Sequence, residues 1–131
     1  MYKSPGIKSG FGVAKELKEL PGRVLAVSME IPWSLLQSQM PWEPDHVHLV
    51  DDMDLPTLEA ADRELPACDV VVGVGGGSCC DFAKYLAWKR GCRMVLVATI
   101  ISVDAPLTNM IAVRVDKTVT YIGDIFPEEL L

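Results

Sequence analysis

VVVGVGGGSCCDFAKYLAW, residues Val70–Trp88, joins a run of valines to an amphipathic helical pattern through three consecutive glycines. A continuous apolar run is typical of a strand that is buried on both faces of a parallel sheet. Glycine at the end of such a strand lets the backbone adopt a positive φ and approach a ligand closely. The stretch therefore predicts a β-strand, a tight turn and an α-helix in immediate succession.

The rest of the chain repeats this alternation. The sequence predicts strands over Arg23–Met29, His46–Val50, Asp69–Val74 and Arg93–Thr99, and helices over Gly10–Leu20, Trp33–Met40, Pro56–Leu65 and Ser78–Gly91. A final stretch, Met110–Gly123, alternates around Asp116 and Lys117 and predicts a β-hairpin. These patterns indicate an α/β fold: a Rossmann-like parallel sheet with helices on both faces and a C-terminal β-hairpin. The length favours a single domain over residues 1–131.

The composition excludes some classes of partner. The formal net charge is −6, whereas proteins that bind nucleic acids or anionic membranes need a basic face. No apolar stretch is long enough to span a bilayer and no signal peptide opens the chain, so we expect a cytoplasmic protein. Half of the residues are apolar, which is enough to fill a core and to leave apolar surface for a partner.

The four cysteines predict no metal site or disulfide. Cys68, Cys79, Cys80 and Cys92 contain no C-x-x-C pair, and two adjacent cysteines do not easily bridge each other. Without a secretory signal, the pattern predicts reduced and mostly buried thiols rather than a redox or zinc role.

The glycine turn is the candidate ligand site. Ligands of doubly wound sheets sit at the carboxyl ends of strands, which is where Gly75, Gly76 and Gly77 fall. A helix that starts near Ser78 would present its free N–H groups and positive dipole end to an anion. The Ser78 hydroxyl and the Asp81 carboxylate add polar groups to the first turn. Taken alone, the turn is equally compatible with a β–α connection that binds nothing.

Two motifs together carry a family resemblance. GVGGGSCCDFAKYLA is followed about one strand later by VLVATIISVDAPLT. The pair resembles the iron-containing alcohol dehydrogenase and glycerol dehydrogenase superfamily, and most of all its glycerol-1-phosphate dehydrogenase branch. The likeness runs from about Gly10 to the last residue. The dehydroquinate synthase branch shares the glycine turn but is a poorer match to SVDAPLT.

This resemblance implies an oxidoreductase that uses NAD or NADP to oxidise an alcohol, or to run the reverse reduction. The cofactor-binding residues that it implies are Gly75, Gly76, Gly77, Ser78, Asp81, Thr99, Ser102 and Thr108. It places Asp104 near the substrate hydroxyls and the nicotinamide, although a bare Asp-Ala-Pro is otherwise typical of a turn.

The chain departs from the family pattern at two positions near the cofactor. Met29 stands where the family often has an aspartate that binds the adenosine ribose, which leaves Glu30 as a replacement or a cofactor with a 2′-phosphate as alternatives. Ala98 replaces the proline that the family has before Thr99.

We expect residues 1–131 to contain none of the metal ligands that the family implies. Superfamily members continue into a helical domain where an aspartate and histidines bind zinc or iron, and we expect residues 1–131 to be the dinucleotide-binding domain without that part, with no metal ligand and no catalytic residue. His46 and His48 fall on one face of a strand, where a surface role is the simpler interpretation. Asp51, Asp52 and Asp54 predict a solvated loop that leads into a helix cap rather than a cation site.

Two kinds of function stay open at this point. The first is the NAD(P)-binding domain of a glycerol-dehydrogenase-like oxidoreductase that is catalytically incomplete alone, or that acts only with a separate chain that supplies the metal domain. The second is a non-enzymatic remnant or interaction module with the same fold, whose apolar domain interface is covered in a homo-oligomer. The expected partners are a dinucleotide together with a second copy or a helical domain.

Overall fold

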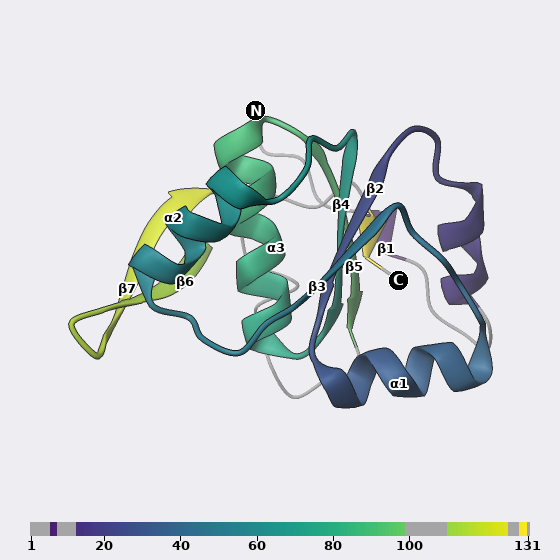
Figure 1. Ribbon diagram of the computed structural model, residues 1–131, viewed down its shortest axis with the longest axis horizontal. Helices are drawn as coiled ribbons and strands as arrows, with labels where there is room; N and C mark the ends of the chain where they lie inside the picture. The colour runs from purple at the N-terminus through teal and green to yellow at the C-terminus, as the bar shows by residue number, and fades with distance from the viewer. Residues whose placement is uncertain (1–5, 8–12, 99–109, 126–128, 131) are drawn as a thin grey trace.

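The computed structural model describes residues 6–7, 13–98, 110–125 and 129–130. Within these residues, six strands form a parallel sheet in the order β1-β8-β5-β4-β2-β3, and β6 and β7 form an antiparallel hairpin. Helices α2 and α3 and the hairpin lie on one face of the sheet, and α1 lies on the other (Figure 1). The predicted fold class is therefore confirmed.

Four strands match the predicted bounds to within one residue. They are β2 (Val24–Ser28), β3 (His46–Leu49), β4 (Val70–Gly75) and β5 (Arg93–Ala98). Two further strands, β1 (Gly6–Ile7) and β8 (Glu129–Leu130), extend the sheet beyond β5. The sequence did not predict them, because two residues are too few to show a period.

Both faces of the sheet are covered, which explains the apolar runs of its strands. Leu25 and Val27 of β2 pack into the core under α2 and α3. Val24 and Ala26 pack on the opposite face, in the core that includes residues of α1. A strand buried on both faces needs apolar side chains at every position, so alternation is lost.

The helices are η1 (Val13–Glu19), α1 (Glu30–Gln39), α2 (Leu55–Glu64) and α3 (Gly77–Arg90). Only 3-10 helix, η1, is described within the predicted helix Gly10–Leu20, whose residues 10–12 lie outside the described part. α1 begins three residues earlier than predicted, because Pro32 lies in its first turn, where the N–H that proline lacks has no helical partner. Gly91 ends α3 in the left-handed conformation, with φ of 63°.

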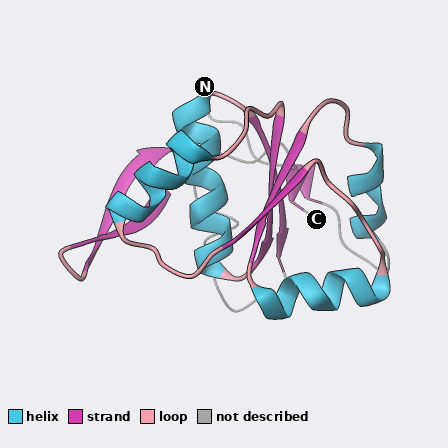
Figure 2. Ribbon diagram, in the orientation of Figure 1, coloured by secondary structure: helices cyan, strands magenta, loops and turns pink. Residues whose placement is uncertain are grey.

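The predicted hairpin is confirmed as β6 (Met110–Val115) and β7 (Thr118–Asp124), drawn in magenta beside the helices in Figure 2. Its turn residues, Asp116 and Lys117, have φ of 50° and 65°. Positive φ at both central residues is typical of a type I′ turn, which matches the right-handed twist of the strands in a two-residue hairpin. Ile111 and Val113 are buried in the same core as α3.

α3 lies against β4 at a distance that only a residue without a side chain allows. A Cβ atom on Gly73 would lie 2.8 Å from Cβ of Ala83 in α3 and 2.9 Å from Cδ2 of Leu96 in β5. Both distances are shorter than van der Waals contact, so the glycine fixes how deeply the helix settles onto the sheet.

We expect Gly73→Ala to lower the free energy of unfolding by about 1–3 kcal/mol, because the new methyl group overlaps Ala83 and Leu96. Urea unfolding followed by tryptophan fluorescence measures the change. The control is Gly91→Asn, at a left-handed position with open space around it, where a loss of less than about 1 kcal/mol is expected. A Gly73→Ala chain as stable as the parent would contradict the close contact.

Candidate functional site

The glycine turn lies where the connections between strands change direction along the sheet. From β2 the chain passes through α1 to β3 on one side, and from β4 it passes through α3 to β5 on the other. The carboxyl ends of β2 and β4 therefore carry connections that diverge. This arrangement opens a crevice at the sheet edge, which is where open α/β sheets bind their ligands.

The ends of β2 and β4 are joined by a buried hydroxyl. Ser28 is fully buried, and its Oγ donates to the carbonyl oxygen of Val74 at 2.8 Å. The Ser28 carbonyl in turn accepts from the N–H of Val50 at 2.7 Å. Three neighbouring strand ends are thus tied together at the floor of the crevice.

Gly75 makes the turn from β4 into α3. Its φ is +141°, and a Cβ atom there would lie 2.7 Å from Sγ of Cys79 and 3.4 Å from Cγ of Pro32. Gly76 is the N-cap of α3, which makes no side-chain capping hydrogen bond. The first turn of α3 therefore directs uncapped backbone N–H groups at the crevice, where an anion is favoured.

A pocket of about 410 Å³ adjoins this turn. It is lined by Met29, Ile31, Pro32, Leu35, Gly76, Gly77 and Ser78. One wall is the apolar start of α1 and the other is the glycine turn. Met29 is the N-cap of α1 and is 40% exposed. Glu30, which follows Met29, is the first residue of α1 and is exposed.

Ser78 and Asp81 face a second, smaller space between α3 and the hairpin. This pocket of about 130 Å³ is lined by Met53, Ser78, Asp81, Ala112, Val113, Arg114 and Val119. Asp81 Oδ1 accepts from the N–H of Ala112 at 3.3 Å. One carboxylate oxygen of Asp81 is thus engaged by β6, and the role of Asp81 toward a cofactor stays a prediction.

Lys84 is fully buried. Its Nζ donates to the carbonyl oxygen of Met110 at 3.1 Å and lies 3.9 Å from Oδ1 of Asp81. A lysine one turn along the helix from Asp81 has its stem in the core and its charge at the foot of the hairpin. The residue therefore joins α3 to β6, a role that only the distant hairpin reveals.

Cys79 and Cys80 are buried inside the first turn of α3. Burial raises the pKa of Cys79 to about 11 and that of Cys80 to about 12. Both stay protonated at neutral pH, as predicted for small core residues, and neither is suited to nucleophilic chemistry.

Thr99, Ser102, Asp104 and Thr108 lie outside the described residues, which resume at Met110. Their places around the cofactor stay predictions.

Hydrogen bonds of Asp52 organise the acidic loop before α2, whose N-cap, Asp54, makes no side-chain capping hydrogen bond. Asp52 accepts from the N–H of Asp54 at 2.9 Å and from the hydroxyl of Thr57 at 2.8 Å. These hydrogen bonds lower the pKa of Asp52.

No group of three or more potential metal ligands occurs within the described residues, so those residues do not fit the metal that the family resemblance implied.

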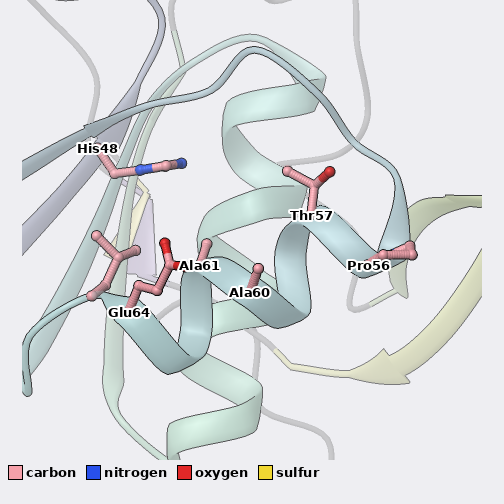
Figure 3. Close-up of a pocket in the computed structure, with 7 residues that line it drawn as sticks. His48, Pro56, Thr57, Ala60, Ala61 and Glu64 are labelled. Atoms are coloured by element: carbon pink, nitrogen blue, oxygen red, sulfur yellow. The ribbon is translucent and has the colours of Figure 1, made fainter.

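His48 lines a separate pocket of about 400 Å³ between β3 and α2. Figure 3 shows its ring directed from the strand toward the helix face that carries Ala61 and Glu64. The ring packs against Phe82, with centroids 4.8 Å apart. Burial lowers the pKa of His48, and the nearby Asp51 only partly offsets this effect.

Comparison with known proteins decides the family. The model of a family described as iron-containing alcohol dehydrogenase matches residues 25–127. The chain belongs to the iron-containing alcohol dehydrogenase family. The resemblance drawn from the two motifs is therefore confirmed.

Parts of the chain are similar to a glycerol-1-phosphate dehydrogenase and a glycerol dehydrogenase. A 73-residue stretch, 56% of the chain, is 33% identical to the glycerol-1-phosphate dehydrogenase (NAD(P)+) of Thermofilum pendens and covers 21% of that protein. A 42-residue stretch, 32% of the chain, is 50% identical to the glycerol dehydrogenase of Thermotoga maritima and covers 12% of it.

Solved structures share the fold over almost the whole chain. The sulfoacetaldehyde reductase of Bifidobacterium kashiwanohense, solved in complex with NAD+, matches with a TM-score of 0.82 and 17% identity, over 99% of this chain and 45% of that one. A probable glycerol dehydrogenase from Sinorhizobium meliloti 1021 matches with a TM-score of 0.78 and 22% identity, over 99% and 39%. The chain spans less than half the length of these proteins.

No membrane-spanning helix is found among the described residues, because each of their helices is too short or too polar for a bilayer.

We expect Lys84→Met to destabilise the chain by about 3 kcal/mol, because it removes the cation beside the largely buried Asp81 carboxylate and the donor to Met110. Urea unfolding gives the free energy, and hydrogen exchange at the amides of β6 tests whether the hairpin loosens. The double variant Asp81→Asn/Lys84→Met is expected to be more stable than the sum of the single losses predicts, since no charge is then left alone. Strict additivity would contradict the pairing.

We expect the free energy of unfolding to fall below about pH 6.5, because the contribution of neutral His48 is lost there. The folded-state pKa of His48 is lowered from its ordinary value of 6.5, so protonation favours the unfolded chain. The stabilisation is complete above pH 6.5 and is lost as the pH falls. Urea midpoints between pH 5 and 7.5 should fall less steeply for His48→Gln than for the parent. Equal slopes for the two chains would contradict the assignment.

Proposed function

We propose that residues 1–131 bind NAD(H) or NADP(H) and form the nucleotide-binding domain of a glycerol-dehydrogenase-like oxidoreductase. The observation that carries the proposal is the uncapped N-terminus of α3 behind the left-handed Gly75, at the point where the connections from β2 and β4 diverge. Family membership and the NAD+ complex of a structural neighbour support it.

The residues present fit a dinucleotide. The pyrophosphate would take hydrogen bonds from the N–H groups at Gly76, Gly77 and Ser78, with the Ser78 hydroxyl as a further donor. The apolar wall formed by Met29, Ile31 and Leu35 offers a surface for the adenosine part. When bound, the nicotinamide supplies hydride transfer to or from the alcohol carbon. The chain's own contribution is to hold and orient this cofactor.

We propose further that these residues bind the cofactor without turning over an alcohol by themselves. Polarisation of the alcohol oxygen by a metal ion needs several ligands, and the described residues bring no such group together. The helical domain that the family resemblance implied, or a separate chain, would supply them.

A second candidate, an interaction module, is favoured by apolar side chains on the outer surface of the molecule. Val119 and Tyr121 on the hairpin are 58% and 63% exposed. Analytical ultracentrifugation tests this candidate: a self-associating chain supports it, and a monomer at high concentration contradicts it.

The deciding experiment is a fluorescence titration with NADH and NADPH. We expect binding by the parent chain and a loss of at least about tenfold in affinity for Gly77→Val, because a branched side chain intrudes where the phosphates approach the first turn of α3. Gly91→Asn, at the other end of the same helix, is the matched control and should bind as the parent does.

A parent chain that binds neither cofactor at millimolar concentration would contradict the proposal. Equal affinities for the parent and Gly77→Val would show that the cofactor binds elsewhere. Alcohol oxidation by the purified chain alone would contradict the proposal that these residues do not turn over an alcohol, and it would leave the proposal of cofactor binding intact.

A further inference from the structure

Two cysteines lie together at the end of α3 that is remote from the glycine turn. Cys68 comes two residues before β4, and Cys92 comes directly before β5. β4 and β5 are neighbours in the sheet, with Val70 opposite Arg93. Residues that are 24 positions apart in the sequence therefore meet at the amino-terminal edge of the sheet.

The thiol of Cys92 lies against Cys68. Its Sγ donates to the carbonyl oxygen of Cys68 at 3.3 Å. Both residues are partly exposed, and both are free thiols. Cys92 comes one residue before the Val70–Arg93 pair and Cys68 two residues before it, so the two cysteines are offset by one residue. Adjacent strands run about 4.8 Å apart, and disulfides join residues whose Cα atoms are about 4.4–6.8 Å apart, so the register brings the two cysteines close to each other.

Arg90 places a fixed positive charge against one of the two sulfurs. Its Nη1 donates to Sγ of Cys68 at 3.5 Å. The guanidinium is held by Asp62, whose Oδ1 accepts from Nε at 2.8 Å, and by the carbonyl oxygen of Pro66, 2.7 Å from Nη1. A cation beside a partly exposed sulfur is the setting in which cysteines become reactive.

The second sulfur lies in a different setting. Burial raises the pKa of the Cys92 thiol, and the neighbouring Cys68 raises it further. Cys68 is the sulfur that accepts a hydrogen bond from the Arg90 cation. A sulfur hydrogen bonded to a cation, with a second thiol beside it, matches an attacking cysteine with a resolving partner.

We propose that Cys68 and Cys92 are a redox-active dithiol that a peroxide converts into a disulfide. The sulfur of Cys68 attacks one oxygen of the peroxide, the O–O bond breaks, and the leaving hydroxide takes up the proton of Cys68 to form water. The Cys92 sulfur then attacks the resulting sulfenic acid. An S–S bond forms, the S–O bond breaks, and hydroxide leaves with the Cys92 proton as a second water. The two thiols lose two electrons and two protons in total.

The disulfide would tie the end of α3 to the start of β4. α3 has 14 residues and is therefore about 21 Å long, so the pair is remote from the glycine turn. The proposal does not depend on cofactor binding, and oxidation is expected to leave NADH affinity unchanged.

The test begins with hydrogen peroxide and the 131-residue chain under native conditions. Non-reducing peptide mapping should find one intramolecular Cys68–Cys92 link, which dithiothreitol reverses. Cys79 and Cys80 are the internal control and should remain free to alkylate after denaturation, because they are buried. The oxidised chain should also unfold several degrees higher than the reduced chain, since the link closes a loop in the unfolded state.

Single variants assign the two roles. Cys92→Ala should accumulate a sulfenic acid on Cys68 that dimedone traps, whereas Cys68→Ala should give no adduct on Cys92. Arg90→Gln is expected to slow oxidation about tenfold and Arg90→Lys to slow it less, because only the lysine keeps a cation near the sulfur.

Two results would overturn the proposal. One is a set of four free thiols after peroxide treatment that oxidises a free-thiol standard. The other is linkage only between molecules. Dimedone on Cys92 in place of Cys68 would overturn the assigned order of attack.

Discussion

The architecture depends on one contact, the approach of α3 to β4 across residues that have no side chain. Gly73 admits Ala83 of the helix at a distance that excludes a Cβ atom, and Gly75 admits Cys79 in the same way. Because the helix is seated so deeply, its first turn opens directly into the crevice between the diverging connections. The rest of the helix lies in the core, where it meets β2, β4, β5 and the hairpin. A bulkier strand end would displace all of these contacts at once.

Local signals in the sequence were sufficient for much of this fold. The valine run predicted β4, the glycines predicted the turn, and the alternation around Asp116 and Lys117 predicted the hairpin. Each of these elements depends on residues that are close together in the chain. The position of the candidate site at Gly75–Ser78 follows from the same local pattern and from the rule for parallel sheets. The site residues predicted after Ala98 come from the family resemblance and not from this pattern.

Features that depend on distant segments were not predictable. The helical pattern around Lys84 does not show that the hairpin covers it, so its burial appears only when β6 is in place. The contact between Cys68 and Cys92 likewise depends on which strands are neighbours and in what register. Two-residue strands such as β1 and β8 carry no pattern of their own. In each case the missing information is tertiary, and propensity does not contain it.

The position of β2 inside the sheet has a consequence for biosynthesis. Ser28 is 46 residues away from Val74, whose carbonyl oxygen its hydroxyl reaches. At a translation rate of about 5–20 residues per second, that partner emerges roughly 2–9 seconds later. During this interval a nascent chain holds β2 with one bare apolar edge, which is the kind of edge that pairs with other chains. The strand order that opens the crevice thus also sets a period in which the growing polypeptide carries an unpaired strand edge.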